Sequence, residues 1–130
     1  MIDHVSIPVR DLGAGARFYD GVLGALGLSR MIERPATIGF GKKYPEFWLN
    51  ARPRMASLPD DTGAHVCLRA SSEEAVRAFH WQALAAGGTC DGAPGDRQAS
   101  MTVYFGAFIR DPDGNRIEAV YFAKPSPAST

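Results

Sequence analysis

The sequence predicts an α+β protein of 130 residues that contains two copies of one small module. Sliding the chain against itself by 61 residues places His4 on His65 without a gap. Self-similarity at a fixed offset indicates repeated structural units, so the two histidines occupy equivalent positions. The same offset aligns Val5 with Val66, Ile7 with Leu68, Ala14 with Ala75, Phe18 with Phe79, Leu23 with Leu84 and Gly27 with Gly88.

The first module is predicted to be β-α-β-β-β. Residues 2–9 alternate apolar and polar side chains, which is the period of a half-buried strand. Asp11 can cap a helix that extends to about residue 25, and Gly27 can end it in a left-handed conformation. Three short strands are then expected over residues 28–34, 36–41 and 45–50.

The second module has the same predicted order of elements, after a linker over residues 51–63. Its first strand runs from His65 through residue 69. Ser71, with Glu74 three residues later, matches a capping box for a helix that stops at residues 87–88. A Gly- and Pro-rich loop is expected over residues 91–100, and we predict that it forms a mobile rim. Strands over about 101–110 and 115–122 follow, joined by the Asp-Pro-Asp-Gly turn of residues 111–114.

The chain length fits one domain. We expect module one over about residues 1–50, module two over about 64–123 and a flexible tail over 124–130. Basic and acidic residues number 14 each, so the basic footprint of a nucleic-acid binder is absent. No apolar run reaches the roughly 18 residues of a membrane span, and no signal pattern opens the chain, so we expect a cytoplasmic protein. Cys67 and Cys90 are expected to be free thiols.

Strand alternation predicts which side chains of the sheets face away from the helices. We call this side of each sheet the open face. Its expected members are His4, Ser6, His65, Cys67, Arg69, Thr102, Tyr104, Phe108, Arg116, Glu118, Val120 and Phe122. The opposite side is strongly apolar and comprises Val103, Phe105, Ile109, Ile117, Ala119 and Tyr121. This partition predicts helices on one side of the sheet and a cavity on the other.

His4, His65 and Glu118 are the candidate metal ligands. Each of them alone is more often a structural or solvated residue. The two histidines, however, are repeat equivalents, and a pseudo-twofold axis brings such positions together. Imidazole nitrogen and carboxylate oxygen suit Zn, Mn, Fe, Ni or Co, and three protein ligands leave positions for water or substrate. The sequence therefore predicts one divalent metal ion.

Several of these motifs resemble the vicinal oxygen chelate superfamily, over nearly the whole chain. They are His4-Val5-Ser6-Ile7-Pro8-Val9, Asp11-Leu12, Phe18-Tyr19, His65, and the run from Asp111 to Glu118. This superfamily includes glyoxalase I, bleomycin-resistance proteins, extradiol dioxygenases, fosfomycin-resistance enzymes and methylmalonyl-CoA epimerase. The resemblance implies paired modules whose curved mixed sheet encloses a metal-centred cavity, with helices outside. It also implies a homodimer, and it maps the metal ligands onto His4, His65 and Glu118.

The chain departs from the best-known members of that superfamily. Trp48 stands where glyoxalase I is expected to have a fourth, acidic ligand, although Glu46 lies two residues away on the same face. Phe108 stands where extradiol dioxygenases usually carry an acidic tyrosine. Ser6 corresponds to the substrate-contacting threonine of fosfomycin-resistance enzymes, whose potassium-binding loop has no counterpart here.

Two classes of function remain open. The first is a metal-dependent lyase, isomerase or transferase acting on a small oxygen-rich substrate by Lewis-acid catalysis. Its candidate catalytic residues are Tyr104 as an acid or hydrogen-bond donor and Cys67 or Glu46 as a base. Its candidate substrate-binding residues are Ser6, Trp48, Arg97, Thr102 and Phe108. The second is a bleomycin-resistance-like binding protein without catalysis, with Trp48, Tyr104, Phe108 and Phe40 as cavity walls. Trp81 is a candidate contact in the expected homodimer.

Overall fold

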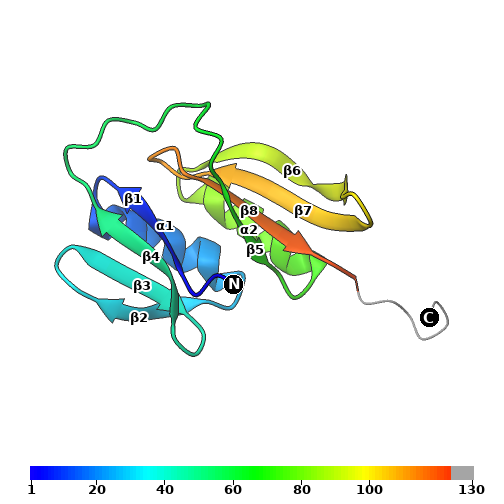
Figure 1. The fold of residues 1–130 in the computed structure, drawn as a ribbon, viewed down its shortest axis with the longest axis horizontal. Coiled ribbons are helices and arrows are strands. Elements are labelled where there is room, and N and C mark those ends of the chain that lie inside the picture. Colours follow the sequence, from blue (N-terminus) through cyan, green and yellow to red (C-terminus); the bar gives the residue numbers. More distant parts are fainter. Residues whose placement is uncertain (124–130) are drawn as a thin grey trace.

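The computed structural model describes residues 1–123, which form two four-stranded sheets and two helices (Figure 1). The first module contains β1 (Val5–Val9), α1 (Leu12–Gly24), β2 (Ser29–Glu33), β3 (Thr37–Gly41) and β4 (Pro45–Ala51). The second contains β5 (Val66–Arg69), α2 (Glu73–Ala85), β6 (Thr89–Gln98), β7 (Val103–Arg110) and β8 (Arg116–Tyr121). The predicted tail lies outside the described residues.

The two sheets have the same topology, which confirms the duplicated α+β fold. Their strand orders are β1-β4-β3-β2 and β5-β8-β7-β6. In each sheet the first strand of the module pairs in parallel with the last strand, and the other pairings are antiparallel. The first strand of each module is therefore a sheet edge. Neither helix in the described part of the chain is long and apolar enough to cross a membrane.

The ends of α1 form as the sequence predicts. The Asp11 carboxylate accepts a hydrogen bond from the main-chain N–H of Ala14 at 3.0 Å, which satisfies one free donor of the first turn. Gly27 has a φ of 82°, a left-handed conformation that glycine adopts at little cost.

The start of α2 differs by one residue from the predicted capping box. Ser72, not Ser71, is the cap, because its backbone is extended and its hydroxyl accepts a hydrogen bond from the N–H of Ala75 at 3.0 Å. Glu73 and Glu74 both fall in the first turn, where negative charge favours the helix dipole.

The prediction of a mobile loop over residues 91–100 is wrong, because most of this segment belongs to β6. It pairs with β7 from Thr89 to Gln98, with register shifts between Cys90 and Gly95. Gly92 allows the close approach of the two strands, since a Cβ there would lie 2.9 Å from the ring of Phe108. The glycines that suggested a loop are instead sites of strand irregularity.

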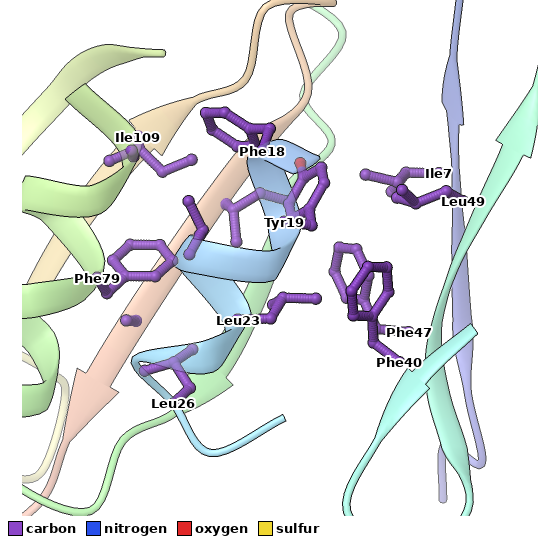
Figure 2. Packing of buried hydrophobic residues seen from close by; sticks show 14 of the residues in the cluster. Ile7, Phe18, Tyr19, Leu23, Leu26, Phe40, Phe47, Leu49, Phe79 and Ile109 are labelled. Atoms are coloured by element: carbon purple, nitrogen blue, oxygen red, sulfur yellow. The ribbon is translucent and has the colours of Figure 1, made fainter. Parts of the chain in front are cut away.

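A continuous apolar cluster includes residues of both modules. Figure 2 shows α1 between the strands of the first sheet and α2, with Tyr19 and Leu23 between Phe47 and Phe79. Phe40 is fully buried in this cluster, so the expectation that it lines a ligand cavity is wrong. Val103, expected among the apolar side chains, is 55% exposed because it begins β7 at the end of the hairpin.

A buried polar network also joins the modules at the Asp-Pro-Asp-Gly turn. The Tyr19 hydroxyl donates to Asp111 Oδ2 at 2.7 Å, and the Asn115 side-chain amide donates to the same oxygen at 2.8 Å. Arg10 Nε donates to Asp113 Oδ1 at 2.8 Å. Burial, followed by the nearby Asp111 charge, raises the pKa of Tyr19 well above its usual value. This turn therefore fixes β8, which carries Glu118, relative to the first module.

Candidate functional site

His65 and Glu118 form the centre of the candidate site. His65 immediately precedes β5, and Glu118 lies in β8, the parallel neighbour of β5. The Nε2 atom of His65 is 3.1 Å from Glu118 Oε1. The histidine side chain is 47% exposed and the glutamate side chain 6%, so the imidazole lies between solvent and a buried carboxylate. Two of the three predicted metal ligands are thus in contact.

Tyr104 holds the second oxygen of the same carboxylate. Its hydroxyl donates to Glu118 Oε2 at 3.2 Å. Desolvation, followed by the negative charge of Glu118, raises the pKa of Tyr104 above its usual value. The phenol therefore remains protonated at neutral pH and can donate a hydrogen bond, in keeping with the role expected for it.

Cys67 lies opposite Glu118 in the register of β5 and β8. Desolvation, followed by the charge of Glu118, raises the pKa of its thiol to about 12. The thiol therefore keeps its proton at neutral pH. These surroundings disfavour the role of a base that we expected for Cys67.

His4 lies near His65 but is turned toward a different partner. Its Nδ1 atom is 2.8 Å from the carboxylate of Asp3, at the exposed start of the chain. Among the described residues, no three His, Cys, Asp or Glu side chains are grouped closely enough to hold a metal ion. His4, Glu46, His65 and Cys67 nevertheless border one cavity of about 330 Å³. His4, the third predicted ligand, therefore borders the same cavity as His65 but does not contact the His65–Glu118 pair.

Ser6 and Trp48 are paired across β1 and β4 on the open face of the first sheet. Ser6 borders a second cavity of about 280 Å³ that also touches His65. The ring of Trp48 lies over Gly39, where a Cβ would be 3.0 Å from it, and the guanidinium of Arg34 is 5.7 Å from the ring centroid. The first sheet thus offers an aromatic surface capped by a cation.

Two aromatic rings flank the His65–Glu118–Tyr104 group on the open face of the second sheet. The centroid of Phe108 is 6.2 Å from that of His65, and the centroid of Phe122 is 5.4 Å from that of Tyr104.

An arginine lies over each of these rings. Arg97 is 5.9 Å from the centroid of Phe108, and Arg69 is 4.9 Å from the centroid of Phe122. Strand alternation predicts Arg69 and Phe122 on this face, and Arg69 is an alternative to Arg97 as the contact for an anionic substrate group. The contact between Arg69 and Phe122 was not predicted. Thr102, by contrast, lies exposed at the β6–β7 connection, and its hydroxyl donates to the carbonyl of Val103.

The sequence resemblance implies a duplicated β-α-β-β-β fold, and the structure has this fold, with His65 just before β5 and Glu118 on its parallel neighbour β8. The chain matches the family model described as "Glyoxalase/Bleomycin resistance protein/Dioxygenase superfamily" over residues 1–119. It therefore belongs to this superfamily.

Two relatives illustrate the match. The chain is 31% identical in sequence to a glyoxalase/bleomycin resistance protein from Albidiferax ferrireducens. The crystal structure of that protein matches with a TM-score of 0.83, and the match covers 94% of this chain and 99% of that chain. Virulence protein STM3117 of Salmonella typhimurium is 30% identical over 119 residues, which cover 90% of this chain and 81% of the relative. The crystal structure of that virulence protein superimposes with a TM-score of 0.63 at 26% identity, covering 95% of this chain and 97% of that one.

Proposed function

We propose that this protein is a metal-dependent enzyme that acts on a small oxygen-rich substrate, as a lyase, isomerase or transferase. The observation that carries the proposal is the approach of His65 Nε2 to Glu118 Oε1 at 3.1 Å. A nitrogen and a carboxylate oxygen at this separation fit a borderline divalent ion such as Zn, Mn, Fe, Ni or Co. His65 and Glu118 would hold the ion, with His4 as the third ligand.

The chain's own residues define what such a site can do. A bound ion would act as a Lewis acid on two neighbouring substrate oxygens and stabilise negative charge that develops on them. Tyr104 keeps its proton and donates a hydrogen bond to Glu118 Oε2, while Glu118 Oε1 contacts His65. The tyrosine therefore orients the carboxylate that would bind the ion. Phe108 has no hydroxyl at the position where extradiol dioxygenases carry an acid, so we favour the other reaction classes over dioxygenation.

Metal analysis of the purified protein tests this proposal. Protein prepared without chelator and then supplied with divalent metal should hold about one ion per chain. His65→Ala and Glu118→Gln should each lose most of that metal, because each removes one of the converging donors. The matched control is His80→Gln, since His80 lies on α2 rather than beside Glu118. Full metal retention in both site variants would contradict the proposal.

The second candidate function, binding without catalysis, rests on the surface formed by Trp48 over Gly39. A sequestering protein needs aromatic walls but no ion. Ligand affinity that is unchanged by chelator and by Glu118→Gln would favour this second function. Loss of both affinity and turnover with the metal would favour the enzyme.

A further inference from the structure

The open face of the second sheet carries more positive charge than its own carboxylates neutralise. Four arginines lie on β5, β6, β7 and β8 there, namely Arg69, Arg97, Arg110 and Arg116. Arg110 forms an ion pair with Asp60, and Arg116 Nη1 lies 3.5 Å from Asp91 Oδ2. Within residues 1–123, Arg69 and Arg97 have no carboxylate partner.

Arg97 is held in place by groups that leave its charge intact. Its Nη2 atom donates to the carbonyl of Ala93, and its Nη1 atom donates to the carbonyl of Asp96 at 3.3 Å. A Cβ at Gly95 would lie 3.1 Å from Nη1, so the missing side chain makes room for the guanidinium. Carbonyl oxygens orient a guanidinium without cancelling its full positive charge, and some of its five N–H donors remain available.

The two unpaired arginines stand on either side of the candidate centre. Arg97 lies directly opposite Tyr104 in the register of β6 and β7, over the ring of Phe108. Arg69 follows Cys67 by two residues on β5, over the ring of Phe122. Each arginine is thus separated from the His65–Glu118–Tyr104 group by one aromatic ring. The ring is Phe122 for Arg69 and Phe108 for Arg97. A guanidinium group is attracted to the face of an aromatic ring, so each ring helps to hold its arginine beside the centre.

We propose that the ligand of this site is a small anion bearing a carboxylate, phosphate or phosphonate group. Arg97 binds that group, and Arg69, on the opposite edge strand, adds positive charge that attracts the anion to the face. The guanidinium fork matches the oxygen atoms of such groups in two parallel hydrogen bonds. The proposal rests on the proposed function for the position of the reacting centre, and it deepens that function by naming the substrate class. A cationic ligand would meet two uncompensated positive charges and is disfavoured.

Calorimetry with simple anions and their neutral isosteres tests this inference on protein that has been loaded with metal. The anionic probes are succinate and methylphosphonate, and the neutral probes are succinamide and dimethyl methylphosphonate. The anions should bind and the neutral compounds should not. Arg97→Gln should weaken anion binding roughly ten- to hundred-fold, as expected for the loss of a hydrogen bond to a charged group. Arg69→Gln should also weaken anion binding, because it removes a positive charge from the same face.

Arg77→Gln is the matched control, because Arg77 also lies over a phenylalanine ring, that of Phe105 at 4.8 Å, but belongs to α2. Anion binding should be unchanged in this variant. Equal binding of the neutral isosteres, an equal loss in Arg77→Gln, or unchanged affinity in both site variants would overturn the inference. Metal content measured in the same samples separates the two proposals: intact metal without anion binding contradicts this inference alone, and anion binding without metal contradicts the proposed metal site alone.

Discussion

At the scale of single residues, the candidate site depends on Glu118, whose two carboxylate oxygens contact His65 and Tyr104. His65 and Glu118 could be paired because strand parity and the repeat together restrict where each side chain points. The Tyr104–Glu118 contact depends on the register between β7 and β8, which pairs Phe108 with Glu118. Strand alternation predicts that Tyr104 and Glu118 lie on the same face of the sheet. It does not predict that they touch, because the register between two strands is set by the tertiary structure.

The hydroxyl of Tyr19 gives the first stability prediction. Tyr19→Phe removes the donor to the buried Asp111 Oδ2 atom, which retains only the Asn115 amide. Removing a hydrogen bond to a charged acceptor typically costs about 1.5–3 kcal/mol. We therefore expect urea unfolding to show a loss of about that size. Tyr44→Phe is the control, because Tyr44 is 52% exposed, and it should change stability little. Equal stability of Tyr19→Phe and the wild type would show that the network does not hold the modules together.

At the scale of elements, local signals predicted both helices and most strands, and they failed where pairing outweighs composition. The glycines and proline of residues 91–100 argue for a loop when only local propensity is considered. In the sheet, β7 supplies the hydrogen-bond partners for this segment. The register between the two strands shifts between Cys90 and Gly95, where some residues have no partner in β7. The shift of the α2 cap from Ser71 to Ser72 has a simpler cause, since two adjacent serines offer equivalent hydroxyls and the backbone selects one.

His80 in α2 gives a prediction of pH dependence. Its Nε2 atom is buried without a hydrogen-bond partner among the described residues, and burial lowers the pKa of the imidazole. A pKa that is lower in the folded state than in the unfolded state means that stability is present above the unfolded pKa and is lost as the pH falls. His80→Leu removes this titration. As the pH falls from 7.5 to 5.5, we expect the wild type to lose stability relative to His80→Leu. Urea unfolding at each pH measures this difference. A difference that is constant over this range would contradict the assignment.

At the scale of the whole molecule, the duplication determines the architecture but not how the third ligand joins the site. The offset of 61 residues makes His4 and His65 equivalent, and both border the same cavity. Equivalence in a repeat requires that the two positions be related by symmetry. It does not state whether the symmetric partner belongs to the same chain. The sequence could therefore name His4 as a ligand but could not assign it to its own chain or to a second copy.

A homodimer is the last prediction, and it bears on that assignment. Each sheet ends in open edge strands, β1 and β2 in the first and β5 and β6 in the second, and exposed edges favour pairing with another chain. Trp81, which is 65% exposed on α2, is an additional candidate contact. Light scattering at micromolar concentration should therefore give about twice the chain mass of 14.0 kDa, and a mass of one chain would contradict the dimer.

Mixed dimers then assign His4. Chains carrying His4→Ala and chains carrying His65→Ala are refolded together, so that each chain lacks one proposed ligand. If His4 completes the site of its own chain, every site in the mixed dimer lacks a ligand and metal remains low. If His4 completes the site of the second copy, one site in each mixed dimer is intact and metal returns to about half of the wild-type content in that species. Because the two single-variant homodimers lack a ligand at every site in both arrangements, any recovery of metal in the mixture identifies a site shared between chains.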